Sequence, residues 1–118
     1  MSLEKYQYFA KITDISDVYD GDTITADIDL GFGVWLTERK FRLAGINAPE
    51  IRGDERSAGL VARDFLREQI DRVDGWVNLK TVRDTKGKYG RYLAYIFIDG
   101  VNINDLLVQE GYAVYKEY

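Results

Sequence analysis

The chain has 118 residues, of which 46% are hydrophobic and 14% aromatic. This suits one domain, spanning residues 1–118, with a core of its own, and it excludes a disordered tail. The net charge of −4, from 16 basic and 20 acidic residues, does not by itself indicate a nucleic-acid-binding protein. A phosphate-binding site would therefore need a local cluster of basic residues.

The chain contains no cysteine and no histidine. The lack of cysteine excludes a disulfide framework and leaves the redox compartment open. The lack of histidine excludes Ser-His and Cys-His nucleophiles and His-ligated zinc. Any general base near neutral pH must then be a carboxylate, a lysine or a tyrosine. Any bound metal must be a hard cation held by oxygen, such as calcium, magnesium or manganese.

Targeting signals are sparse. No apolar run approaches the length of a membrane span, so we expect no membrane partner. The start of the chain, at residues 1–3, does not form a signal peptide. A cytoplasmic location is the simplest expectation, and a secreted one stays open if a leader has been removed. We expect a monomer.

The first part of the chain predicts strands. Residues 8–18 are rich in β-formers and predict the first strand. The Asp-Gly pair at 20–21 predicts a hairpin turn. Residues 23–30 then alternate between polar and apolar side chains, as a half-buried strand does. After a Gly-Phe-Gly break at 31–33, residues 34–43 predict a third strand with weaker alternation.

The pattern changes after the third strand. Residues 44–56 predict a loop, which holds the only proline. Between residues 57 and 73 the apolar residues fall three to four apart, which predicts a helix. Residues 76–82 and 91–98 return to a strand pattern. A polar loop with two glycines separates these last two strands.

The last predicted element is a short helix. Asn102 is a credible N-cap, with Asp105 three residues on, and Gly111 is the expected stop. The whole order is three strands, a helix, two strands and a short helix. A helix between the third and fourth of five strands is the layout of an OB-type β-barrel. A small α+β sheet domain is the main alternative.

The first two candidate functional segments flank the predicted second and third strands. The Asp-Gly-Asp-Thr sequence at 20–23 is either an ordinary hairpin turn or a pair of carboxylates suited to a hard cation. In the segment 41–50, Arg42 is either a surface arginine or a functional one. The Asn-Ala-Pro-Glu sequence at 47–50 is likewise either an ordinary turn or part of a site.

The third candidate segment, residues 83–91, holds four basic residues and one acid in an otherwise acidic chain. A solvated hairpin tip would explain this composition. A phosphate-binding loop would also explain it, since arginine grips phosphate oxygens with two parallel hydrogen bonds and Tyr89 could stack on a base.

Taken together and in this order, the three segments resemble the staphylococcal nuclease family. The family pattern is an Asp-Gly-Asp-Thr turn, an Arg-Leu strand end that runs into a Pro-Glu loop, and Lys-Tyr-Gly-Arg before an apolar strand. This chain has these motifs at 20–23, at 42–43 with 49–50, and at 88–91, and residues 106–111 resemble the helix that follows. Three motifs at suitable spacing are far more specific than one.

The resemblance implies a calcium-dependent nuclease that hydrolyses phosphodiester bonds in DNA or RNA. It implies that Arg42, Glu50 and Arg91 form the catalytic set. Glu50 would orient or deprotonate the attacking water, and the two arginines would hold the phosphate and stabilise its developing charge.

The resemblance also implies binding roles. Asp22, Asn47 and the backbone carbonyl of Ala48 would hold calcium. Asn47 stands where the family usually has an aspartate, so we expect weaker metal binding or a different metal preference. The substrate-binding residues would be Lys88 and Tyr89. Apart from the resemblance, Tyr115 is either a further stacking residue in the substrate groove or an ordinary core or surface aromatic.

Two other functions stay open. A barrel of this family that binds nucleic acid or a partner without cutting is the main alternative, and Asn47 and the acidic net charge favour it. A purely structural OB domain is the other, and it would leave the basic segment 83–91 unexplained.

Overall fold

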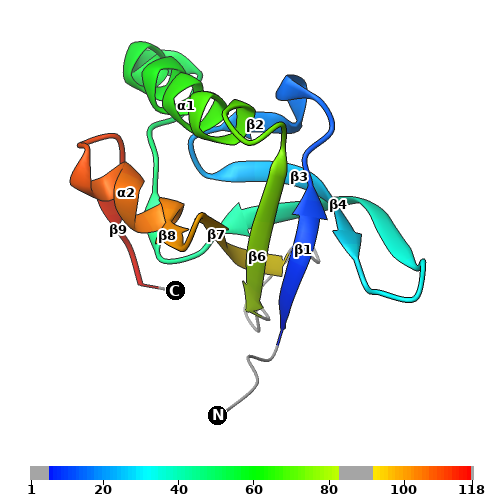
Figure 1. Cartoon of the computed structure of the whole chain (residues 1–118). Coiled ribbons are helices and arrows are strands. Elements are labelled where there is room, and N and C mark those ends of the chain that lie inside the picture. Colours follow the sequence, from blue (N-terminus) through cyan, green and yellow to red (C-terminus); the bar gives the residue numbers. More distant parts are fainter. Residues whose placement is uncertain (1–5, 83–91, 118) are drawn as a thin grey trace.

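The computed structural model describes residues 6–82 and 92–117 (Figure 1). In chain order its elements are β1 (Gln7–Lys11), a 3-10 turn (Ile15–Asp17), β2 (Val18–Asp20), β3 (Thr23–Asp29), β4 (Trp35–Leu43), β5 (Ile46–Asn47), a second 3-10 turn (Gly53–Glu55), α1 (Arg56–Asp71), β6 (Trp76–Val82), β7 (Tyr92–Ile98), β8 (Val101–Asn102), α2 (Ile103–Gln109) and β9 (Val114–Tyr115).

Five strands close into a barrel. Strand β1 pairs with β6 on one side and with β3 on the other, and β4 and β7 complete the ring. These pairs are antiparallel except for β4 with β7, which run parallel where Phe41 lies opposite Tyr92. Helix α1 lies between the third and fourth barrel strands in sequence, and α2 follows the fifth. The predicted OB-type barrel is therefore confirmed.

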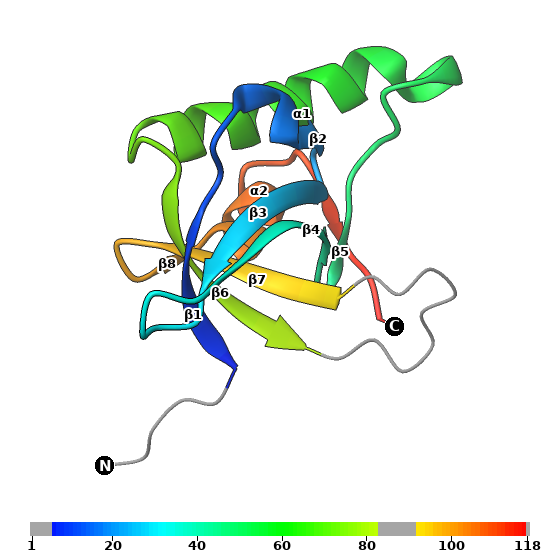
Figure 2. The same cartoon turned by 90° about the vertical axis from the view of Figure 1, so that its right-hand side faces the viewer.

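The core follows from the residue patterns of β3 and α1. In β3, Ile24, Ala26 and Ile28 are buried, whereas the polar residues between them are half-buried. In α1 the buried stripe includes Leu66 and Ile70. Helix α1 lies across one end of the barrel, where this stripe joins the core (Figure 2). Neither described helix has the length and hydropathy that a membrane crossing requires.

The prediction of one strand over residues 8–18 is wrong. Strand β1 ends at Lys11, a 3-10 turn follows, and β2 covers only Val18–Asp20. The cause is local. The side chain of Asp14 accepts a hydrogen bond of 3.0 Å from the backbone N–H of Ser16, which offers the backbone an alternative to strand pairing.

The prediction of an unbroken loop over residues 44–56 is also wrong. Residues Ile46–Asn47 form β5, which pairs with β9 near the end of the chain, with Ile46 opposite Tyr115 and Asn47 opposite Val114. The backbone N–H of Lys116 extends this contact to the carbonyl of Gly45 at 2.8 Å. The C-terminal segment therefore holds the strand that carries Asn47.

Candidate active site

The turn between β2 and β3 places two carboxylates beside α1. Asp20 and Asp22 are both buried, with 8% and 6% of their surface exposed. The side chain of Asp20 accepts a hydrogen bond of 3.0 Å from the N–H of Asp22, which fixes the turn. A Cβ added at Gly21 would lie 2.7 Å from the Cβ of Ala48 and 2.9 Å from that of Ala62, so any other residue would force these neighbours to move.

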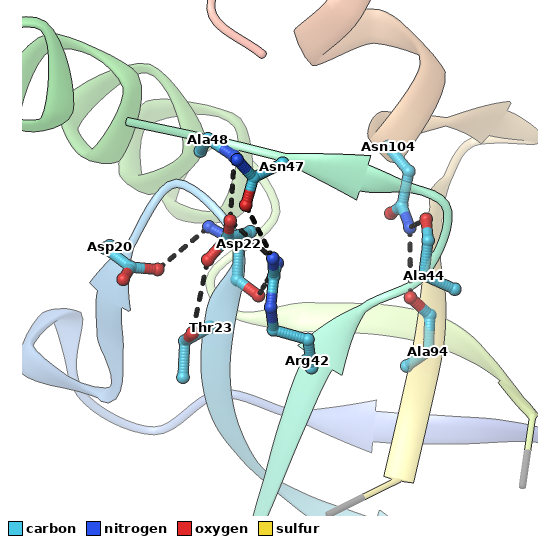
Figure 3. A network of polar contacts seen from close by, with 9 residues as sticks. All are labelled: Asp20, Asp22, Thr23, Arg42, Ala44, Asn47, Ala48, Ala94 and Asn104. Atoms are coloured by element: carbon cyan, nitrogen blue, oxygen red, sulfur yellow. Dashed lines mark hydrogen bonds and ion pairs between the residues drawn. The ribbon is translucent and has the colours of Figure 1, made fainter. Parts of the chain in front are cut away.

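The carboxylate of Asp22 is the centre of a polar network (Figure 3). Its Oδ2 lies 2.7 Å from Nη1 of Arg42, which sits near the end of β4. The same oxygen accepts a hydrogen bond of 2.7 Å from the backbone N–H of Ala48. The hydroxyl of Thr23 donates to Oδ1 of Asp22 at 3.3 Å.

Arg42 links this network to β5. Its Nη2 donates to Oδ1 of Asn47 at 3.0 Å, while Nη1 holds Asp22 (Figure 3). A single planar guanidinium therefore bridges two oxygen-bearing side chains, as its fork geometry allows.

Burial changes the acid–base chemistry of Asp22. Desolvation of its carboxyl group raises the pKa from 3.8 to about 7, and the neighbouring side chain of Asp20 acts in the same direction. The N–H of Ala48 and the charge of Arg42 oppose this rise in the pKa without cancelling it. A buried carboxyl with such a raised pKa is typical of a functional site.

These groups border a cleft of about 400 Å³ on the surface of the barrel. The cleft is lined by Tyr19, Asp20, Asp22, Thr23, Lys40, Arg42, Asn47 and Glu50. The structure thus brings together Asp22, Arg42, Asn47 and Glu50, four residues that the sequence predicted from two separate segments. The side chain of Glu50 is exposed at this cleft.

The structure does not place the remaining predicted residues in this cleft. Arg91, Lys88 and Tyr89 are outside the described residues. Tyr115 is not among the residues that line the cleft. It lies on β9, 61% exposed, and its hydroxyl donates to Asp105 at 3.3 Å.

Sequence reasoning missed three residues at or near this site. Lys40 and Tyr19 line the cleft, and nothing in their local sequence distinguishes them from other surface residues. Asn104 is 1% exposed on α2, and its amide donates to the carbonyls of Ala44 and Ala94 at 2.9 and 3.0 Å (Figure 3). In the sequence, an asparagine within the apolar stripe of a helix indicates a buried side chain that bonds backbone groups, as Asn104 does here.

The oxygen donors at the cleft suit a hard cation in type. Asp20, Asp22 and Glu50 supply carboxylates and Asn47 an amide oxygen, which are the ligands that calcium prefers. Within residues 6–82 and 92–117, however, no three acidic, histidine or cysteine side chains gather closely enough to hold an ion by themselves. A cation bound at this cleft would therefore need a further oxygen, such as the neutral amide oxygen of Asn47.

The barrel and its cleft define an OB-fold protein with a charged site built from an arginine and several oxygen donors. Comparison with known proteins narrows this class. The family model described as staphylococcal nuclease homologue matches residues 40–118. The chain belongs to this family.

Several curated proteins are similar to the chain. The thermonuclease of Staphylococcus intermedius is 32% identical, over 88% of this chain and 59% of its own length. The thermonuclease of Staphylococcus hyicus is 31% identical, over 86% of this chain and 57% of its own length. An uncharacterized protein of Methanocaldococcus jannaschii is 28% identical, over 90% of this chain and 58% of its own length. The chain thus spans less than two thirds of each of these relatives.

Proposed function

We propose that this chain is a single-domain, calcium-dependent nuclease that hydrolyses phosphodiester bonds in DNA or RNA. The observation that carries the proposal is the shared cleft of Asp22, Arg42, Asn47 and Glu50 in a member of the staphylococcal nuclease homologue family. The similarity to two thermonucleases supports the same reaction class.

Arg42 would bind and stabilise the reacting phosphate. A phosphodiester under attack gathers negative charge on its equatorial oxygens, and a guanidinium aimed at them binds that state more tightly than the substrate. Losing one such donor typically costs about 3 kcal/mol, or on the order of a hundredfold in rate. Lysine would be a poorer substitute because it lacks the planar fork. Arg91 would be the second donor.

Glu50 would act on the attacking water. Its exposed carboxylate borders the cleft that holds Arg42, so a water between them could be oriented and deprotonated as it attacks phosphorus. When bound, calcium would supply positive charge and a more acidic water. Asp22, Asn47 and the carbonyl of Ala48 would hold it. Lys88, Tyr89 and Tyr115 would contact the nucleic acid around this centre.

A binding module that does not cut is the alternative. The amide of Asn47 accepts a hydrogen bond from Arg42 at 3.0 Å, where a charged ligand would attract a cation more strongly. With a net charge of −4, such a protein would bind nucleic acid through a local basic region rather than through its overall charge.

Single-stranded DNA incubated with the protein, with calcium or with a chelator, separates these functions. We expect cleavage by the parent only with calcium, and its loss in Glu50→Ala and Arg91→Ala. Glu55→Ala is the matched control, because Glu55 is an exposed acid that precedes α1 and its side chain makes no capping hydrogen bond. Salt-sensitive binding without cleavage would favour the binding module, and a parent inert in both respects would refute both functions.

A further inference from the structure

Gly59 in α1 lies against the backbone of Glu50. A Cβ added at Gly59 would be 2.5 Å from the carbonyl carbon of Glu50 and 2.9 Å from the nitrogen of Ile51, with the Glu50 carbonyl oxygen closer still. All three are backbone atoms, so no side-chain rotation could relieve the overlap. The peptide group between Glu50 and Ile51 therefore rests directly on the helix.

The conformation of Gly59 does not explain why glycine is present. The residue lies inside α1 with ordinary helical backbone. Glycine in a helix interior is unfavourable relative to alanine, because it loses more conformational entropy on folding. The close approach of the Glu50 backbone is what requires the missing side chain.

One face of helix α1 contacts both the segment that carries Glu50 and the turn that carries Asp22. Gly59 contacts the backbone of Glu50. Ala62 lies three residues further on, on the same side of the helix, and it packs against Gly21, the residue before Asp22. The backbone that carries Glu50 and the turn that carries Asp22 therefore lie against the same face of α1.

We propose that Gly59 is a positioning residue for Glu50. It sets the distance of the Glu50 carboxylate from the reacting phosphate by letting the backbone approach α1 without an intervening side chain. This inference rests on the proposed nuclease function. A displacement on the order of 1 Å at a reacting group can cost roughly a hundredfold in rate.

The first test is kinetic. Gly59→Ala should lower kcat by about ten- to a hundredfold, while KM and the calcium Kd stay within about twofold, because Asp22 and Arg42 are held by other contacts. In a Glu50→Gln background the same substitution should have little further effect on kcat, since Gly59 acts through Glu50. Ala58→Gly, at an exposed neighbouring helix position, is the control and should leave kcat unchanged.

The second test does not depend on activity. In the parent protein, NMR should show a nuclear Overhauser contact between the Gly59 α-protons and the amide proton of Ile51. In Gly59→Ala, backbone amide shifts should concentrate at residues 49–51, and in Ala58→Gly they should not.

Each outcome has one meaning. An unchanged kcat in Gly59→Ala, an equal loss in the Glu50→Gln background, or a missing NMR contact in the parent would overturn the inference. A parent that shows the contact but cleaves no substrate would instead overturn the nuclease function, and with it the effect on kcat expected from Gly59. If Gly59→Ala does not fold, the parent contact alone decides whether Glu50 rests on α1.

Discussion

The side chains of Arg42 and Asn47 are joined by a hydrogen bond of 3.0 Å from Nη2 to Oδ1. The same guanidinium also holds Asp22 at 2.7 Å. Two side chains that we propose as calcium ligands thus both contact an arginine that we propose as a phosphate ligand. A cation and Arg42 would compete for the same oxygens, so calcium binding and the freedom of Arg42 should be linked.

Asn47→Asp should tighten calcium binding. The substitution adds a negative charge at a position that borders the cleft, and one charge pair near a protein surface is worth on the order of several kcal/mol before desolvation. We expect the calcium Kd from isothermal calorimetry to fall roughly tenfold, which is about 1.4 kcal/mol. Asn47→Ser, which keeps a neutral oxygen, is the control. A Kd that does not change on adding the carboxylate would contradict a ligand role for this position.

Calcium affinity should rise with pH. In the folded, metal-free protein the pKa of Asp22 is raised from 3.8 to about 7, so below neutral pH its carboxyl group holds a proton that a cation must displace. We expect a larger calcium Kd at pH 5 than at pH 8. Below pH 7, calorimetry in buffers of different ionisation enthalpy should also detect proton release when calcium binds. Binding at pH 5 without proton release would be inconsistent with this pKa.

The raised pKa of Asp22 should make the metal-free protein less stable as the pH rises. Between pH 3.8 and about 7 the folded state holds a proton on Asp22 that the unfolded state has lost. The contribution of this group to the free energy of unfolding is therefore largest below that window and declines as pH rises through it. Urea unfolding of the metal-free parent should show this decline relative to Asp22→Asn. Parallel pH profiles for the two proteins would count against it.

Gly21→Ala should displace the turn that carries Asp22, a proposed calcium ligand. The new methyl group would overlap the Cβ atoms of Ala48 and Ala62, and overpacking of this kind costs about 1–3 kcal/mol. We expect a lower midpoint of urea unfolding and weaker calcium binding, because the turn that carries Asp22 is pushed away from Ala48. Adding Ala62→Gly removes one of the two overlaps and should restore part of both losses. Because glycine inside α1 itself costs about 1 kcal/mol, calcium binding is the deciding measurement, and a double variant that binds calcium no better than Gly21→Ala would contradict this contact as the cause.

Asn104→Leu should destabilise the fold strongly. Its Oδ1 accepts from the N–H of Ile96 at 3.1 Å, and its amide donates to the carbonyls of Ala44 and Ala94. Ala94 keeps a second partner in the N–H of Ala44. Two buried backbone groups would still lose a bond, at about 1–3 kcal/mol each.

Denaturant unfolding measures this loss. Asn102→Ala, which removes only the N-cap of α2, should cost about 1 kcal/mol and is the control. Equal losses in the two variants would show that the hydrogen bonds made by Asn104 contribute no more than a cap.

Local patterns were enough to predict much of the fold. The alternation in β3, the apolar stripe of α1 and the cap at Asn102 are each set by neighbouring residues, and the structure confirms all three. Long-range contacts carried no such signal. The pairing of β5 with β9 joins two-residue strands from distant parts of the chain, and no periodicity extends over so few residues.

The candidate site was partly predictable because several of its residues lie in short local motifs. The motifs at 20–23 and 41–50 predicted Asp22, Arg42, Asn47 and Glu50, which share the cleft, but they gave no indication of Tyr19 or Lys40. The hydrogen bond between Arg42 and Asn47 and the close contact at Gly59 depend on how β4, β5 and α1 pack together. The roles of Arg91, Lys88 and Tyr89 stay predictions.

The most direct test is to measure the rate of single-stranded DNA cleavage against calcium concentration, in the parent and in Asn47→Asp. The calcium concentration at half-maximal rate should match the calorimetric Kd in the parent, and both should fall together in the variant. Cleavage that persists in excess chelator, or calcium binding with no cleavage at any concentration, would contradict a calcium-dependent nuclease site built on Asp22, Arg42, Asn47 and Glu50.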